Sequence, residues 1–339
     1  MSKCLLYPYD ISLLHMVLHD FDNISVKEIA SPNGWGYVGE DAGDKIGIQT
    51  GIIVKDRQDI CWKQIDKLLL MPSILPLHEK ELQAVVALAE SFHVEVVNMR
   101  VPKEHVLLKS ETDMPERELK EIDLPIVLVI GTGDRTNKFD IQLVIRDCFE
   151  QNGYNVSQIG TKGYCEYLGF HSFPEFMYSG QSVTEGIIKF NHYVYEIANT
   201  EEADAIVIGV PGGLAPYNEK YLNDFGYLNF MVANAVKPDY VVLATACVDY
   251  NSEYINSMTN VLQYKYEYEV DAVFIGNSYI NWEVTKSSDR LIHVTLDAEY
   301  VKREAEKAKA YSVYEKSHVE QFKKHLIGTL SGYGEYSTL

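Results

Sequence analysis

Residues able to bind phosphate are concentrated in one short segment of the sequence, Gly131–Lys138, which reads GTGDRTNK. Backbone N–H groups of such a loop can surround an anion, and the lysine at its end adds a positive charge. Two further charged side chains, Asp134 and Arg135, lie inside the segment. If a phosphoryl or acyl group reacts here, Lys138, Asp134 and Arg135 are the candidate catalytic residues, with Arg135 stabilising developing negative charge.

A strand and a helix are predicted on either side of this segment. Leu124 and the run Ile126–Ile130 are apolar without helical spacing, which indicates a strand buried on both faces. A helix is predicted from Lys138 to about Gly153, because one stripe of its surface is apolar: Phe139, Ile141, Val144, Ile145, Cys148 and Phe149. Strand, glycine-containing loop and helix together favour an anion at the N-terminus of the helix.

The loop matches a phosphate-binding P-loop only in part. The common motif is G-x-x-x-x-G-K-[ST], and a longer variant is GTxxxxGK[ST]. Gly131, Thr132 and Lys138 fit the longer variant, but Asn137 replaces its last glycine and Phe139 replaces the hydroxyl that binds Mg²⁺. Asparagine tolerates a left-handed backbone, so the loop can still close. The alternative is a turn that needs glycine only for tight packing. We favour phosphate or nucleotide binding over that turn, and place metal-assisted hydrolysis behind both.

The composition narrows the class of protein. The chain has 339 residues, a net charge of −19, 46% hydrophobic and 23% charged residues, which is typical of a globular protein long enough for two domains. The negative charge argues against nucleic acid and anionic membranes as partners, because phosphate contacts need a basic face. We also expect no membrane span and no signal peptide. Five scattered cysteines without CxxC spacing suggest reduced thiols and a cytoplasmic protein: Cys4, Cys61, Cys148, Cys165 and Cys247.

Alternating strand and helix patterns predict an α/β fold with mainly parallel sheets and helices on both faces. Residues 1–101 are expected to form a Rossmann-like domain, for which no dinucleotide site is claimed. Residues 102–123 are charged and contain prolines, which suggests a linker. Residues 124–330 are expected to form a P-loop NTPase-like domain, and residues 331–339 a tail.

Two later strands of the second domain bear on the site. The strand Ala205–Val210 is followed by Pro211, Gly212 and Gly213. P-loop proteins carry an acidic residue near the end of such a strand, which reaches the Mg²⁺ shell, but Gly209 stands at that position. Another strand ends at Asn277, and Asp297 is a plausible N-cap for a charged helix.

The second domain resembles the dethiobiotin-synthetase-like branch of P-loop proteins in GTGDRTNK at 131–138, DAIVIGVPGGL at 204–214 and VFIGN at 273–277. The resemblance implies ATP or another nucleotide as ligand, with Asn277 at the adenine. Mg²⁺ is not expected, because Phe139 and Gly209 replace both metal contacts. The nucleotide site predicted in this way comprises Gly131, Thr132, Gly133, Asp134, Arg135, Thr136, Asn137, Lys138, Gly212, Gly213 and Asn277.

Over its whole length the chain is similar to the clostridial peptide-maturation-system proteins, through its LLYPYD start, its GTGxRTNKF loop and its IGxPGG turn. The resemblance implies an accessory role in peptide natural-product maturation, with a precursor peptide or a radical-SAM maturase as partner. Two alternatives stay open: an ATP-dependent ligase or CoA-dependent acyl-transfer enzyme acting on a peptide or amino acid, and a non-catalytic scaffold for a maturase. Assembly into a homo-oligomer is also left open.

Two weaker groupings complete the candidates. His15 and His19 are four residues apart and could share a helix face, but a zinc site needs a further ligand, so we expect ordinary histidines. A loop carries Cys165 and His171, which could pair as nucleophile and base. The same loop holds Glu166 and Glu175, either of which could replace the missing acid near Lys138.

Overall fold

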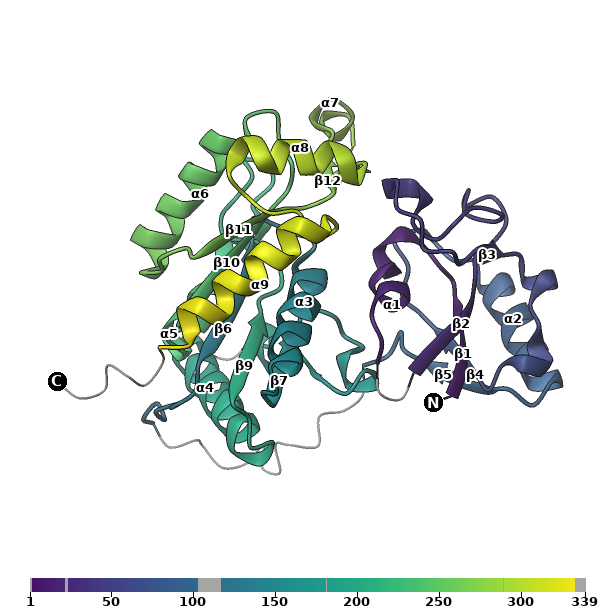
Figure 1. Cartoon of the computed structure of the whole chain (residues 1–339), viewed down its shortest axis with the longest axis horizontal. Helices are drawn as coiled ribbons and strands as arrows, with labels where there is room; N and C mark the ends of the chain where they lie inside the picture. The colour runs from purple at the N-terminus through teal and green to yellow at the C-terminus, as the bar shows by residue number, and fades with distance from the viewer. Residues whose placement is uncertain (1, 22–23, 103–116, 181, 289, 333–339) are drawn as a thin grey trace. The chain divides into compact units, whose positions relative to one another are not determined.

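The computed structural model describes residues 2–21, 24–102, 117–180, 182–288 and 290–332 (Figure 1). The chain forms two compact units, one made of residues 1–103 with 163–169 and the other of 104–162 with 170–339. Both are α/β units built on parallel sheets, as the alternating pattern predicted. Within the described residues, no helix is long and apolar enough to cross a membrane.

The first unit has a five-stranded parallel sheet in the order β3-β2-β1-β4-β5. Its strands are β1 (Ser2–Tyr7), β2 (Ile24–Ala30), β3 (Val54–Lys55), β4 (Lys67–Leu70) and β5 (Glu95–Asn98). Its helices are α1 (His15–Leu18), α2 (Glu79–Ser91) and the short 3₁₀ turns η1 (Ile11–Leu13), η2 (Asp44–Ile46), η3 (Arg57–Asp59) and η4 (Trp62–Gln64). Side chains of β1 and β4 pack against α2 in one apolar cluster.

One carboxylate organises the long glycine-rich loop between β2 and β3. Asp41 accepts hydrogen bonds from the backbone N–H groups of Gly43 (2.9 Å), Thr50 (2.9 Å) and Gly51 (2.6 Å), and from the Thr50 hydroxyl (2.8 Å). A side chain at Gly43 would meet the carbonyl oxygen of Ile48 at 2.3 Å, so this glycine is required for the close approach. The loop is therefore held by its own polar contacts.

A short segment of the later chain belongs to the first unit. Residues 163–169, which include the 3₁₀ turn η5 (Cys165–Tyr167), return to it by contact. The hydroxyl of Tyr164 lies 2.9 Å from Nε2 of His15, and the hydroxyl of Tyr167 donates to the Asn98 carbonyl at 3.1 Å. The irregular, aromatic sequence of this loop gave no indication of that return.

The second unit has a six-stranded parallel sheet in the order β11-β10-β6-β9-β7-β8. The strands are β6 (Ile126–Gly131), β7 (Val156–Gly160), β8 (His171–Ser172), β9 (Ala205–Gly209), β10 (Tyr240–Thr245) and β11 (Ala272–Ile275). The helices are α3 (Lys138–Gln151), α4 (Val183–Thr200), α5 (Tyr227–Ala235), α6 (Asn251–Tyr266), α7 (Trp282–Lys286), α8 (Ala298–Ala308) and α9 (Lys316–Leu330), with the 3₁₀ turns η6 (Glu175–Tyr178) and η7 (Asn223–Gly226).

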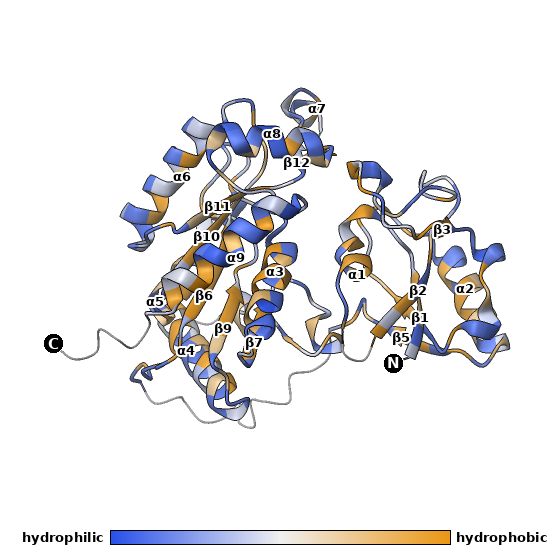
Figure 2. Cartoon of the chain, viewed as in Figure 1, coloured by the Kyte–Doolittle hydropathy of each residue, from blue (hydrophilic) through white to orange (hydrophobic). Residues whose placement is uncertain are grey.

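Alternate residues of the central strand β6 face opposite layers, as strand geometry requires. Ile126, Leu128 and Ile130 pack with α4, α5 and α6 on one face. Val127 and Val129 pack with α3 and α9 on the other. Figure 2 shows the resulting pattern, with orange along β6 and β9 and much of α8 blue. The buried strand predicted before the phosphate-binding segment is thus confirmed.

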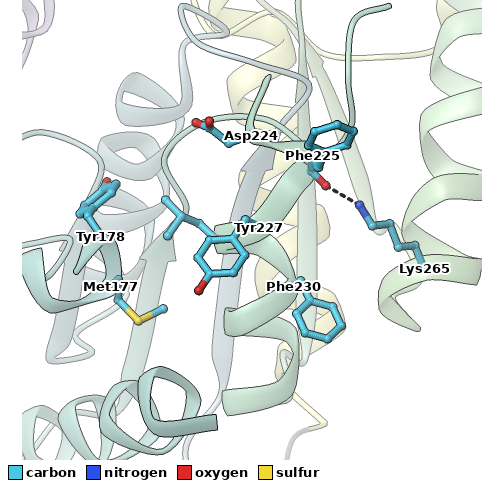
Figure 3. Close-up of a pocket in the computed structure, with 8 residues that line it drawn as sticks. Met177, Tyr178, Asp224, Phe225, Tyr227, Phe230 and Lys265 are labelled. Atoms are coloured by element: carbon cyan, nitrogen blue, oxygen red, sulfur yellow. Dashed lines mark hydrogen bonds between the residues drawn. The ribbon is translucent and has the colours of Figure 1, made fainter. Parts of the chain in front are cut away.

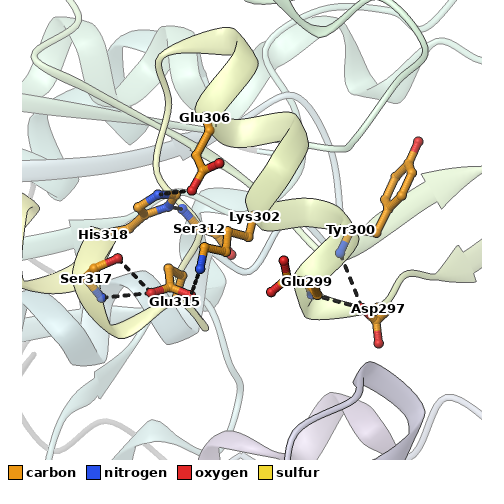
Figure 4. A network of polar contacts seen from close by, with 9 residues as sticks. All are labelled: Asp297, Glu299, Tyr300, Lys302, Glu306, Ser312, Glu315, Ser317 and His318. Carbon is orange, nitrogen blue, oxygen red and sulfur yellow. Dashed lines mark hydrogen bonds and ion pairs between the residues drawn. The ribbon is translucent and has the colours of Figure 1, made fainter.

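Beyond this sheet the chain forms an antiparallel hairpin, β12 (Ser278–Ile280) with β13 (His293–Thr295), which leads into α8 and α9. Asp297 caps α8 as predicted, accepting from the N–H groups of Glu299 (2.9 Å) and Tyr300 (3.3 Å) (Figure 4). Glu315 caps α9 through the N–H and hydroxyl of Ser317, and also pairs with Lys302 of α8 at 3.1 Å. One carboxylate therefore ties the start of α9 to α8.

We predict that Glu315→Ala lowers the free energy of unfolding by about 0.5–2 kcal/mol, the usual range for a lost N-cap. Hydrogen bonds from Ser317, together with Lys302, lower the pKa of Glu315 from 4.5 to about 2. The carboxylate therefore stabilises the fold fully above pH 4.5, and its contribution fades as the pH falls towards 2. The difference from wild type, measured by urea unfolding, should be full at pH 7 and shrink below pH 4.5.

The matched control is Glu320→Ala, at an exposed position of the same helix. It should leave the urea midpoint nearly unchanged at both pH values. Equal effects of the two substitutions at pH 7 would show that Glu315 does not act as a cap.

Candidate functional site

The phosphate loop, residues Gly131–Lys138, joins the end of β6 to the start of α3. Thr132 anchors it to the neighbouring strand: its N–H donates to the Ala244 carbonyl at 2.9 Å, and its hydroxyl accepts from the Ala246 N–H at 3.3 Å. Arg135 and Asn137 both have left-handed backbones, with φ of 58° and 60°. The predicted strand, loop and helix are therefore present in the predicted order.

Asn137 occupies the position where the motif has its last glycine, and its side chain compensates for the left-handed backbone. The side-chain oxygen accepts from the backbone N–H of Asn277 at 2.9 Å. The side-chain nitrogen donates to Asp140 at 3.2 Å and to the hydroxyl of Tyr314 at 3.1 Å. Its left-handed backbone bears out the expectation that asparagine tolerates this conformation, and its amide ties the loop to the β11–β12 turn and to Tyr314, which precedes α9.

Lys138 connects the two segments that were expected to form the site. Its Nζ donates to the carbonyl oxygens of Gly133 and Gly212, both at 2.7 Å, and the residue is only 6% exposed. Burial lowers the pKa of this ammonium to about 8; Asp134 opposes that shift and Lys162 adds to it. The phosphate loop and the turn after β9 thus share one buried cation.

Two glycines of the site are required by packing. A side chain at Gly131 would meet the Thr136 hydroxyl at 2.7 Å and Lys138 Nζ at 3.0 Å. A side chain at Gly213 would meet Asn223 Nδ2 at 1.9 Å, and that nitrogen donates to the Thr132 carbonyl at 3.1 Å. At these two positions glycine is therefore needed for tight packing, which is the alternative interpretation considered for the loop. The buried lysine is present in addition.

Other side chains occupy the two places from which P-loop proteins hold Mg²⁺. Phe139 is 2% exposed and packs near the ring of Phe170. The space beside Gly209 holds the amide of Gln142, whose oxygen would lie 2.3 Å from a side chain there and whose nitrogen donates to the Ile159 carbonyl at 2.9 Å. In the described part of the chain, no three His, Cys, Asp or Glu side chains are grouped to hold a metal ion. The residues at these positions do not fit Mg²⁺.

Tyr217 belongs to the site although no sequence pattern pointed to it. A side chain at Gly133 would meet the Tyr217 hydroxyl at 1.5 Å, so the tyrosine lies directly against the phosphate loop. Burial raises the pKa of this hydroxyl, as do Tyr254 and Asp134, while a hydrogen bond with the backbone of Asp134 acts in the opposite direction. The hydroxyl oxygen of Tyr217 therefore already contacts the backbone of the phosphate loop at Asp134. The ring of Trp282 lies 6.2 Å from that of Tyr217.

Asn277 lies in the turn between β11 and β12, next to the phosphate loop. Its backbone N–H holds Asn137, and its side-chain nitrogen donates to the Leu296 carbonyl at 3.0 Å. Its side-chain oxygen is buried and has no hydrogen-bond partner among the described residues. A role for Asn277 at the adenine stays a prediction.

An apolar pocket of about 740 Å³ lies between η6, η7 with α5, and the end of α6 (Figure 3). Tyr178, Phe225 and Phe230 line it and are 59%, 56% and 42% exposed. Lys265 Nζ closes one side by donating to the Phe225 carbonyl at 2.6 Å. Through Asn223, the residue that begins η7, the pocket wall is hydrogen-bonded to Thr132 of the phosphate loop.

Of the weaker groupings, the histidine pair does not form, and the pairing of Cys165 with His171 stays a prediction. α1 ends at Leu18 and His19 has an extended backbone, so His15 and His19 do not share a helix face. His171 pairs with Glu201 at 2.6 Å. Cys165 and Glu166 belong to the first unit. Replacement of the missing acid by Glu166 or Glu175 also stays a prediction.

Comparison with known proteins shows the fold and no family. No family model matches the sequence, and no curated protein matches it. The crystal structure of a DUF1611 family protein from Anabaena variabilis is similar with a TM-score of 0.58 and 12% identity, over 98% of this chain and 99% of that chain. A nucleotide-binding protein from Archaeoglobus fulgidus, solved with ADP, matches with a TM-score of 0.34 and 10% identity, over 61% of this chain and 88% of that one. The first similarity shows the fold, over 98% of this chain.

We predict that Phe139→Ser destabilises the protein by about 3–5 kcal/mol, because it removes a buried aromatic ring and leaves a cavity next to the loop. Phe139→Leu, which keeps most of the volume, should cost less than about 1.5 kcal/mol. Urea unfolding of the two variants checks both values. If the serine variant were as stable as wild type, Phe139 would be dispensable to the core and the position would be free for a metal ligand.

Proposed function

We propose that the second unit binds the phosphates of a nucleotide, ATP or a related compound, at the phosphate loop and does so without metal-dependent hydrolysis. The observation that carries the proposal is the buried ammonium of Lys138, which lies between the carbonyls of Gly133 and Gly212. An ammonium group has three N–H donors, and these two contacts use two of them. A buried cation at a helix N-terminus is a strong site for an anion.

Metal-independent binding is supported by the two filled positions. Phe139 offers no ligand atom, and beside Gly209 a neutral amide, Gln142, stands in place of a carboxylate, with its oxygen accepting from the Thr161 N–H at 3.3 Å. The phosphate charge would then be balanced by Lys138, by the loop N–H groups and by Arg135. The hydroxyl of Tyr217, which now contacts the loop, would have to move or to become a ligand contact.

We further propose an accessory role in peptide natural-product maturation, with a precursor peptide or a radical-SAM maturase as partner. The support is the whole-length resemblance in LLYPYD, GTGxRTNKF and IGxPGG. One observation favours the enzyme alternative, a ligase or CoA-dependent acyl transferase: an apolar pocket adjoins the loop and could hold an acceptor group. A scaffold would need neither the lysine nor the pocket.

The test is isothermal titration of the full chain with ATP, ADP and CoA, with and without Mg²⁺. Wild type should bind at least one of them equally well in both conditions. Lys138→Met should weaken binding roughly 10- to 100-fold, since a charge-assisted hydrogen bond is lost. Lys237→Met, at an exposed position, is the matched control and should bind like wild type.

Three other results would change the conclusion. Binding that requires Mg²⁺ would mean that another carboxylate supplies the metal site, and the ligase alternative would lead. Turnover of a peptide with ATP or an acyl-CoA, lost in Lys138→Met, would establish the enzyme. No binding, together with unchanged complex formation with a maturase in Lys138→Met, would leave the scaffold.

The affinity should also depend on pH. An anion binds the ammonium form of Lys138, whose pKa in the free protein is about 8. The affinity for ADP should therefore be nearly constant below about pH 7 and fall by up to about tenfold per pH unit above pH 8. In Lys138→Arg, the guanidinium stays charged over this range, so titrations between pH 7.5 and 9.5 should give a flat profile. An identical slope in both proteins would assign the titration to another group.

A further inference from the structure

The first unit contains a cavity of about 170 Å³ that the nucleotide proposal does not use. Its walls come from the end of β1 (Tyr7), the residues after β2 (Ser31–Trp35), the residues after β3 (Asp56–Gln58) and the entry to α2 (Pro76–Glu81). Every one of these strands is parallel, so the cavity lies at the carboxyl edge of the sheet.

The strand order creates a topological switch point at this edge, because the chain leaves β1 first to one side of the sheet and later to the other. The chain proceeds from β1 to β2 and β3 on one side, and to β4 and β5 on the other. In open parallel sheets, the crevice at such a switch point, beyond the carboxyl ends of the strands, is where ligands bind. Tyr7 is the last residue of the central strand β1 and lies at that crevice.

The hydroxyl of Tyr7 is buried and has no hydrogen-bond partner among the described residues. Burial raises its pKa to about 12, with Glu81 and Asp56 adding to the shift and Arg57 opposing it. Tyr7 lines the cavity together with these three charged residues. Tyr9 is equally buried, yet its hydroxyl donates to the Ala42 carbonyl at 2.6 Å. An unpaired buried hydroxyl costs stability and therefore indicates a missing partner.

The charges around the cavity define what that partner can be. Arg57 is already paired with Glu81 at 2.7 Å, and Asp56 accepts from the Gln58 N–H at 2.8 Å and from the side-chain amide of Asn33. Two carboxylates face one guanidinium, so the lining has a net negative charge that repels an anion. Trp35 and Leu77 add apolar surface to the lining.

We propose that this cavity binds a small primary amine that carries a ring or a short apolar group. The ammonium is held by Glu81 and Asp56 and donates to the Tyr7 hydroxyl, while the apolar part lies against Trp35 and Leu77. The size is suitable, because a cavity of about 150 Å³ accommodates benzene in another protein. The site lies within the first unit and does not depend on nucleotide binding by the second.

The experiment uses the full chain and three probes of one shape: benzylamine, benzyl alcohol and benzoate, titrated at pH 7 and followed by NMR and calorimetry. Benzylamine should bind with one site per chain, benzyl alcohol at least tenfold more weakly, and benzoate not at all. Equal binding of all three, or preference for benzoate, would overturn the assignment of charge. Absence of benzylamine binding would overturn the site.

Tyr7→Phe tests the hydroxyl, with Tyr9→Phe as the matched control. Tyr7→Phe should keep or raise the melting temperature without ligand, because the lost hydroxyl has no partner, and should weaken benzylamine binding at least tenfold. Tyr9→Phe should lower the melting temperature and leave the affinity unchanged. Unchanged affinity in Tyr7→Phe would refute the role of the hydroxyl. Should that variant not fold, Glu81→Gln, which keeps the size and removes the charge, should give the same tenfold loss.

Discussion

The geometry of the second unit depends on a buried positive charge. Lys138 begins α3, yet its ammonium reaches back to the Gly133 carbonyl and across to the Gly212 carbonyl. A cation in that position cannot be left without acceptors, so the loop and the turn after β9 must both present carbonyl oxygens to it. Gly131 and Gly213 permit the close approach, because a side chain at either would collide with the atoms around it.

Each residue that departs from the P-loop motif makes packing or hydrogen-bond contacts that stabilise the altered loop. Asn137 takes the left-handed conformation and uses its amide to hold the β11–β12 turn and Tyr314. Phe139 extends the apolar packing of α3, and Gln142, one turn later, fills the space that an acidic residue at position 209 would need. Restoring one metal ligand alone would therefore disturb packing without completing a metal site. The loop and its lysine are those of the proposed phosphate site, while Phe139 and Gly209 stand at the two positions that carry metal contacts in P-loop proteins.

Much of this arrangement could be predicted from sequence because it is local. The apolar run Ile126–Ile130, the stripe along α3 and the N-cap Asp297 each depend on a few neighbouring residues, and all are present. Contacts across long stretches of chain could not be predicted. Tyr217 against Gly133, Gln142 beside Gly209 and the return of residues 163–169 to the first unit depend on how separate elements meet. No periodicity or motif records such contacts.

The two sheets place their chemistry in the same kind of location with opposite charge. Both are parallel, and in both the polar side chains follow the carboxyl ends of the strands. At the second sheet a buried lysine and a helix N-terminus favour an anion. At the first, two carboxylates and an unpaired tyrosine hydroxyl favour a cation. Since one ligand group cannot satisfy both environments, the two proposed sites call for two chemically different ligands.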